Sequence, residues 1–377
     1  MYIQVSVSRR KKKKNRIQLM LVISVILAAL TFAVRMFAVS RPDITEKYFS
    51  RGLYPVTSSI QTGIANLFPF SLYEISILLL ILFFLYMLFR LIRSIYAKNF
   101  VREAARFFTF ILFTASLGWF LFNFLWNLNK YRIPLKDRLS LQVNESSVSE
   151  LSSTYKALVL RANEIRSGLS LTNENISGRE MARAVLDTAW EGYRPLSDIY
   201  PFFHSKRVRV KGLIFSRIQT ISGYAGVYSF LTGEPNINIE PPLVTLPHSA
   251  CHEIAHQMGI TFEDEANYTG FLACKYHTDP LFQYSGYLSA ITYAGNELYR
   301  HSPHLYEEIS SLLIDEIKAD QRYIRNFWDT HKKERITKIA DDINDYYLKS
   351  NNQPDGLQSY GKFVDLLIAD FLEDGEI

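Results

Sequence analysis

LPHSACHEIAHQMGITFEDEANY, residues 246–268, is the stretch of this 377-residue chain that predicts most about its chemistry. Residues four apart on an α-helix project from nearly the same face, so a helix here brings the side chains of His252 and His256 together. Two such imidazoles can hold one metal ion, and the carboxylate of Glu253 lies beside the position that a water would occupy. The stretch therefore predicts a catalytic zinc (Zn2+) site with Glu253 as the general base.

Helix-boundary residues surround this motif. Pro247 suits a first helical turn and Gly259 suits a left-handed cap, which together predict a helix from about 247 to 258. Thr261 followed by Asp264 fits a capping box and predicts a second helix a few residues after the first. A further ligand is then close by. The alternative, a surface helix with solvated histidines, requires all of these signals to coincide.

The segment resembles the glutamate-type zinc peptidases, in which the two-histidine helix precedes a helix with a Glu ligand and, four residues on, an Asp. This resemblance implies that Glu263 is the third ligand and that Asn267, which stands where the family has Asp, orients a histidine ring. On a helix Glu263 and Asn267 share a face, whereas Glu265 points to the opposite side and remains the competing ligand. His248 is expected either to lie in the first turn of the helix or to contact a residue that binds the metal. A fourth metal ligand is less expected there, because a catalytic zinc site keeps one position open.

Three apolar runs in the first third of the chain predict a membrane region over residues 17–129. They centre on residues 17–34, 75–89 and 107–128, and we expect three transmembrane helices at about 17–38, 71–92 and 107–128. The helices of a soluble core could supply the shorter runs. The last run is too long for that alternative, so the lipid bilayer is an expected partner.

The distribution of Lys and Arg predicts the topology. Seven of these residues lie in a basic tail over residues 1–16, and the loop between the second and third spans is also basic, so both are expected to be cytoplasmic. The first span reads as an anchor and not as a cleaved signal. We therefore expect a multi-pass protein of the bacterial inner membrane, with its zinc motif on the extracytoplasmic side.

Charge and cysteine usage exclude other classes. The net charge of +5 depends on the basic tail, and no Gly-rich phosphate loop is present, so neither nucleic acid nor a nucleotide is an expected partner. Cys251 and Cys274 are the only cysteines, and we expect two buried apolar side chains, with a disulfide between their helices left open. The oligomeric state is not predicted.

Residues 130–377 have the composition of a mainly helical extracytoplasmic domain. Capping boxes are expected at Ser147 with Glu150 and at Ser177 with Glu180, and a polar bend at residues 351–356. Alternating apolar residues between about 206 and 239 predict a small β-sheet. Zinc peptidases commonly hold an extended substrate on an edge strand upstream of the histidine helix, and residues 226–238 are the candidate by that resemblance, with an ordinary hairpin as the alternative.

Motifs along nearly the whole chain resemble the bacterial membrane family called domain of unknown function 3810. The motifs that carry this resemblance lie at residues 49–55, 233–238, 250–257, 263–267 and 284–287. This resemblance implies a membrane-anchored α+β protein, with three transmembrane helices before a zincin-like metallopeptidase domain. The family has no established substrate, so it implies an architecture more than an activity.

The expected function is hydrolysis of peptide or other amide bonds by a zinc-activated water, with a peptide or protein as substrate. Tyr284, Tyr287, Tyr293 and His277 carry donors suited to an oxyanion, and none is assigned. One alternative is a zinc-binding membrane sensor or scaffold without catalysis. An intramembrane protease is the other, and the acidic residues after the motif argue against it.

Overall fold

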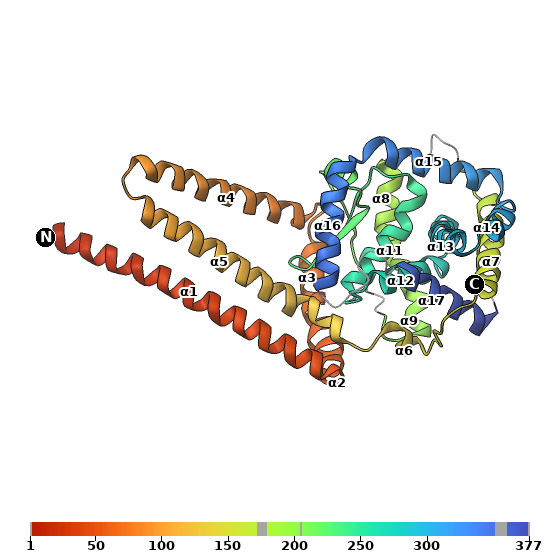
Figure 1. The fold of residues 1–377 in the computed structure, drawn as a ribbon, viewed down its shortest axis with the longest axis horizontal. Helices are drawn as coiled ribbons and strands as arrows, with labels where there is room; N and C mark the ends of the chain where they lie inside the picture. The colour runs from red at the N-terminus through yellow and green to blue at the C-terminus, as the bar shows by residue number, and fades with distance from the viewer. Residues whose placement is uncertain (1, 172–178, 204–205, 351–359, 376–377) are drawn as a thin grey trace. The chain divides into compact units, whose positions relative to one another are not determined.

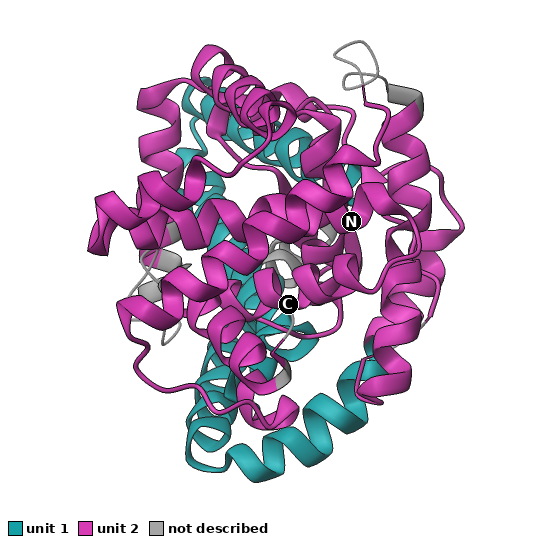
Figure 2. Cartoon of the chain, turned by 90° about the vertical axis from the view of Figure 1, so that its right-hand side faces the viewer, with its two compact units in different colours: residues 1–57, 73–132 teal, residues 58–72, 133–377 magenta. Residues whose placement is uncertain are grey.

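The structure is a computed structural model that describes residues 2–171, 179–203, 206–350 and 360–375. This part of the chain is mostly helical, with a three-stranded sheet, and three helices near the N-terminus are long and apolar enough to cross a membrane (Figure 1). These features confirm the corresponding parts of the expected fold class. The chain divides into two compact units, coloured separately in Figure 2: residues 1–57 with 73–132, and residues 58–72 with 133–377.

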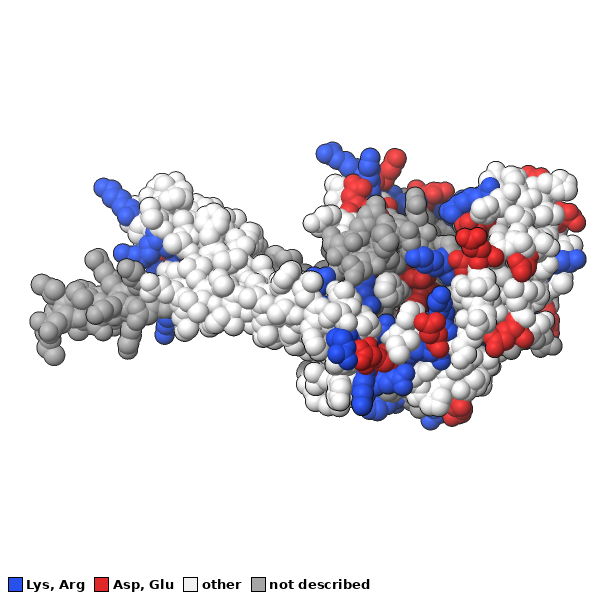
Figure 3. Space-filling model, turned by 60° about the horizontal axis from the view of Figure 1, so that its bottom comes forward, with Lys and Arg blue, Asp and Glu red and all other residues white. Residues whose placement is uncertain are grey.

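The first unit contains the three candidate membrane spans. They are Arg16–Ser40 within α1 (Tyr2–Ser40), α4 (Leu72–Tyr96) and α5 (Phe100–Leu125). At most 17% of the most apolar window of any of them is buried. Figure 3 shows the visible face of these helices as an almost continuous surface without charged residues. Helices with this much exposed apolar surface match a bilayer and not water as their solvent.

The third of these helices differs from the expected range. It begins at Phe100 and not at 107, and it ends at Leu125, after which the chain forms the 3₁₀ helix η2 (Asn127–Tyr131). The early start has an electrostatic reason. Glu103, in the first turn of α5, accepts a hydrogen bond from Arg90 Nη2 at 2.6 Å and also pairs with Arg106, so the basic connection continues as helix.

A buried carboxylate joins separate parts of the first unit. After α1 come the short helix α2 (Pro42–Ile44) and the π-helix η1 (Thr45–Leu53), which carries Glu46 with only 3% of its surface exposed. Glu46 pairs with Arg51 at 2.7 Å and with Arg132 at 3.2 Å. A buried charge is costly unless it is paired, so these two guanidinium groups stabilise the fold of this segment.

The second unit packs its helices around one hydrophobic core, in which Leu158, Ile254, Phe271 and Phe363 are fully buried. Its helices are α3 (Tyr54–Asn66, from residue 58 onward), α6 (Leu135–Leu139), α7 (Val148–Ser167), α8 (Arg179–Thr188), η3 (Ala189–Gly192), α9 (Tyr193–Ile199), α10 (Ser216–Ser222), η4 (Leu243–Thr245), α11 (Leu246–Gln257), α12 (Glu263–Lys275), α13 (Pro280–His301), α14 (Pro303–Ser310), α15 (Asp315–His331), α16 (Glu334–Ser350) and α17 (Tyr360–Asp374).

The expected small sheet is present in the second unit. It is built from β1 (Lys211–Gly212), β2 (Gly226–Ser229) and β3 (Glu234–Ile237). The strand order is β1-β3-β2, with β1 parallel and β2 antiparallel to the central β3. Strand β2 is therefore at an edge of the described sheet, and both β2 and β3 contact α11. Helix α10, between β1 and β2, was not predicted from the sequence.

Of the helix starts predicted from capping boxes, one is confirmed and one is wrong. The capping box at Ser147 is confirmed, because its hydroxyl accepts from Glu150 N at 3.2 Å while its own N donates to the Glu150 carboxylate at 2.7 Å. The box at Thr261 is wrong. Helix α12 starts one residue later, with extended Phe262 as its N-cap, and the Thr261 hydroxyl has no hydrogen-bond partner in the structure. The predicted box at Ser177 and the bend at 351–356 lie outside the described residues.

Candidate metal centre

Helices α11 and α12 pack directly against each other and carry the residues of the motif. Gly270 of α12 lies against the backbone of His252, where a Cβ added at Gly270 would be 3.0 Å from the backbone nitrogen of His252. Pro247 lies in the first turn of α11, and Gly259 takes the expected left-handed conformation after it, with φ of 81°. This turn lets the chain reverse and begin α12 at Glu263, close to the two histidines.

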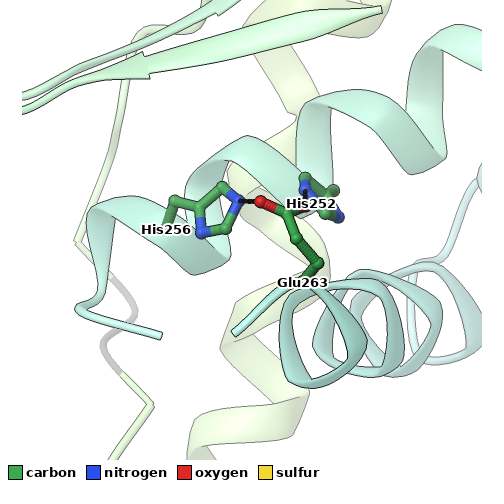
Figure 4. Close-up of side chains that lie close together, drawn as sticks. All are labelled: His252, His256 and Glu263. Atoms are coloured by element: carbon green, nitrogen blue, oxygen red, sulfur yellow. Dashed lines mark ion pairs between the residues drawn. The ribbon is translucent and has the colours of Figure 1, made fainter. Parts of the chain in front are cut away.

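Three side chains converge between these helices. Figure 4 shows His252 and His256 on one face of α11 with the carboxylate of Glu263 between them. Glu263 Oε2 lies 3.3 Å from His252 Nε2, and Glu263 Oε1 lies 3.6 Å from His256 Nε2. One possible ligand atom of each of the three residues lies within 4.8 Å of the corresponding atoms of the other two. The Glu263 side chain keeps 25% of its surface exposed, so the cluster is open to solvent.

Hydrogen bonding fixes the orientation of one imidazole. His256 Nδ1 lies 2.7 Å from the carbonyl of Ile260, and this contact requires a proton on Nδ1, because a carbonyl can only accept. Nε2 on the other side of the ring faces Glu263, and in the neutral ring this nitrogen carries the lone pair that a metal ion requires. Burial, the largest single effect, lowers the pKa of His256, but the charge of Glu263 and the hydrogen bond to it, together with the charge of Glu253 and the Ile260 carbonyl, raise this pKa to about 9. Burial raises the pKa of Glu263, but the charges of the two histidines and the hydrogen bonds to them together hold it well below its usual value.

The structure separates the two candidate third ligands. Glu263 faces the histidines, whereas the Oε1 atom of Glu265 accepts a hydrogen bond from Leu135 N at 2.7 Å, at the start of α6. Glu265 thus stabilises the N-terminus of another helix, in keeping with its expected position on the opposite side of α12. Of the two carboxylates, only Glu263 belongs to the cluster.

Glu253 lies between α11 and the sheet. It is 6% exposed, and burial raises the pKa of its carboxyl group. A Cβ at Gly226, the first residue of β2, would lie 2.6 Å from Glu253 Oε1 and 2.8 Å from its Cγ. The other oxygen, Oε2, is buried and has no hydrogen-bond partner in the structure. The Glu253 carboxylate therefore occupies the space that a side chain at position 226 would fill. The sequence did not predict this contact, although a glycine inside a strand often marks a close approach.

Asn267 is buried on α12, but its predicted role of orienting a histidine ring has no matching hydrogen bond in the structure. Its Nδ2 atom has no partner, and its backbone oxygen lies 3.2 Å from His248 Nε2. Burial lowers the pKa of His248 to about 3, which keeps this ring neutral. His248 therefore lies in the first turn of α11, as expected for a helix-start residue, its ring contacts α12, and it is outside the donor cluster.

All four downstream donor candidates have structural partners. The Tyr284 hydroxyl donates to Asp320 at 2.6 Å, Tyr287 is buried against Phe271, and the ring of His277 stacks on Phe282 at 3.8 Å. Tyr293, the fourth, packs edge to face against Phe363 with the ring centroids 5.3 Å apart. Burial, and to a smaller extent the charge of Glu263, raises the pKa of Tyr293 to about 12. The two cysteines are buried and unbridged, as expected for apolar side chains.

The donor set fits a zinc ion. Two nitrogens and one carboxylate oxygen are the protein ligands of many catalytic zinc sites. Ligand atoms about 2.0–2.2 Å from a tetrahedral zinc ion lie roughly 3.3–3.6 Å apart. The distances from His252 Nε2 to Glu263 Oε2, 3.3 Å, and from His256 Nε2 to Glu263 Oε1, 3.6 Å, are of this size. These residues also lie outside the three candidate membrane spans.

Comparison with known proteins identifies one relationship. A family model described as "Protein of unknown function (DUF3810)" matches residues 49–368. No curated protein and no solved structure matches the chain.

Proposed function

Since this chain belongs to the DUF3810 family, whose description gives no activity, we propose its function from the site itself: a membrane-bound zinc metallopeptidase with a zincin-like domain. The observation that carries the proposal is the convergence of His252, His256 and Glu263 next to a buried Glu253. A zinc ion bound by the three donors would supply Lewis acidity, which polarises a carbonyl group and acidifies water.

The protein's own residues supply the rest of the chemistry. Glu253 is the general base: its Oε2 atom, buried and without a hydrogen-bond partner in the structure, takes the proton of the attacking water and later delivers it to the leaving amine. Gly226 gives this carboxylate its space, and the Ile260 carbonyl holds the His256 ring so that Nε2 faces the metal position.

Strand β2 supports a peptide as the substrate. It lies at an edge of the described sheet and begins at Gly226, in contact with Glu253. An extended peptide that pairs with a sheet edge presents its carbonyl groups at regular intervals, so a strand next to the base can place one of them at the metal. The three candidate spans and the basic residues at the N-terminus, at the end of α4 and at the start of α5 support a site on the extracytoplasmic side of the bacterial inner membrane.

A Glu253→Gln variant of the full chain tests this function. We expect it to retain zinc and to hydrolyse peptides at least about 100-fold more slowly, because the amide cannot accept the proton. A mixture of peptides analysed by mass spectrometry provides the readout, and Glu265→Gln, which makes the same substitution outside the cluster, is the control and should remain active.

Equal rates for Glu253→Gln and the unaltered protein would remove the general-base role. Zinc bound without hydrolysis of any peptide by the unaltered protein would instead support a zinc-binding sensor or scaffold.

A further inference from the structure

Helix α3 and the loop that follows it have an unusual surface. Residues 58–72 belong to the second unit, yet the sequence from 54 to 72 contains no charged residue. Ile60, Ile64 and Leu67 recur at helical spacing and are 59%, 53% and 77% exposed. The outer face of a helix in water normally carries charged and polar side chains. This outer face is instead suited to a solvent less polar than water.

The opposite face of α3 is firmly attached to the second unit. The side-chain amide of Gln257, at the end of α11, donates to the hydroxyls of both Ser58 and Thr62 at 2.9 Å. The ammonium group of Lys211, on β1, is buried and donates to the carbonyl of Ala65 at 2.9 Å. The helix is therefore held in one orientation, and its apolar face is directed outward as a fixed surface.

Basic side chains border this apolar face. Lys206 Nζ donates to the hydroxyl of Ser59 at 3.0 Å, and the guanidinium of Arg209 lies 3.5 Å from the carbonyl of Phe68. Arg207, between them in the sequence, is exposed. An apolar stripe flanked by Lys and Arg is the pattern of helices that lie in the interface of a membrane with anionic lipids.

We propose that the outer face of residues 58–70 lies in the headgroup layer of the bilayer, with Lys206, Arg207 and Arg209 next to anionic lipid phosphates. Chain continuity supports lipid as the occupant, because α4, a candidate membrane span, begins at Leu72 immediately after this segment. Gln257 directly follows His256, so the contact also holds the histidine helix near the membrane surface.

The lipid contact is tested in the full chain reconstituted into nanodiscs that contain phosphatidylglycerol. A fluorophore is attached at Leu67→Cys or, as the control, at Leu160→Cys on α7, where the leucine is 52% exposed. The two native cysteines are fully buried and should not react. We expect the label at 67 to be shielded from aqueous iodide and quenched by nitroxide lipids, and the label at 160 to show the reverse. Iodide quenching of equal strength at both positions would overturn the proposal.

The electrostatic part has its own test. Shielding of the label at 67 should be stronger in nanodiscs with phosphatidylglycerol than in those of phosphatidylcholine alone. Lys206→Gln with Arg207→Gln should remove that difference, whereas Lys332→Gln with Lys333→Gln, an exposed basic pair elsewhere, should preserve it. If the label at position 67, with all basic side chains in place, is shielded equally in both kinds of nanodisc, the role given to the basic side chains is contradicted.

Discussion

Helices α4 and α11 place their residues in opposite ways. No residue in the most apolar window of α4 is buried, whereas ten of the twelve residues of α11 are buried, among them His256 and Glu253. In α4 the apolar residues face outward because the expected solvent is lipid. In α11 they face a protein core, and the buried polar groups that interrupt them carry a desolvation cost. The difference separates a helix whose exposed apolar surface suits a bilayer from a helix that keeps costly polar groups inside a protein core, as the proposed metal site requires.

The largest expected contrast comes from truncating one leucine in each region. Leu158→Ala, at a fully buried position on α7, should lower the free energy of unfolding by about 2–5 kcal/mol, because it leaves a cavity. Leu82→Ala, at a 53% exposed position on α4, should cost about 1 kcal/mol or less. Denaturant titration of the full chain in detergent, followed by tryptophan fluorescence, measures both. Equal destabilisation would mean that the two regions do not differ in solvent.

A charge placed at two equally exposed leucines separates lipid from water. Leu82→Arg should reduce membrane insertion by about 3 kcal/mol, since an arginine in a span must be taken into the bilayer. Leu160→Arg, 52% exposed on α7, should change stability by no more than about 0.5 kcal/mol. A topology reporter placed in the connection between α4 and α5 measures the insertion of α4, since α1 and α5 would keep the chain in the membrane in either case. Normal insertion of Leu82→Arg would show that α4 is not a span.

Gly226→Ala tests the polar interior of the second unit. The added Cβ would lie 2.6 Å from Glu253 Oε1 and displace this carboxylate, so hydrolysis should slow by about 100-fold while zinc is retained. Gly168→Ala is the matched control, because its Cβ would meet its nearest atom at 3.5 Å. Peptide turnover and metal content are measured on the same samples. Unchanged turnover in Gly226→Ala would show that the close approach does not position the base.

The smallest expected effect concerns helix starts. Ser147→Ala removes the capping box of α7 and should lower stability by about 1 kcal/mol. Asn99, the N-cap of α5, makes no side-chain capping hydrogen bond, so Asn99→Ala should have little effect. Thermal unfolding of the two variants compares them directly, and a larger loss for Asn99→Ala would reverse the expected order.

Local pattern predicted the parts of the fold that local forces determine. The apolar runs gave three helices near their expected positions, and alternation with glycines gave the sheet before α11. The helical-face argument also separated Glu263 from Glu265, because it depends only on spacing along one helix. The cap at Thr261 failed, since Phe262 remained extended and shifted the helix start by one residue.

Contacts between distant segments could not be read from the sequence. The approach of Gly226 to Glu253 depends on how the sheet packs on α11, and the bonds from Gln257 to Ser58 and Thr62 join residues nearly 200 positions apart. Periodicity describes which face of an element is apolar, and it contains no information about the partner of that face. The attachment of residues 58–72 to the second unit follows from such long-range packing.

Metal analysis of the purified full chain tests the central claim most directly. The unaltered protein and Glu265→Gln should each contain one zinc ion per chain, whereas His256→Ala and Glu263→Gln should lose it while retaining the helical circular dichroism of the folded protein. Correctly folded, unaltered protein that binds no zinc would contradict the account, as would loss of zinc from Glu265→Gln but not from Glu263→Gln.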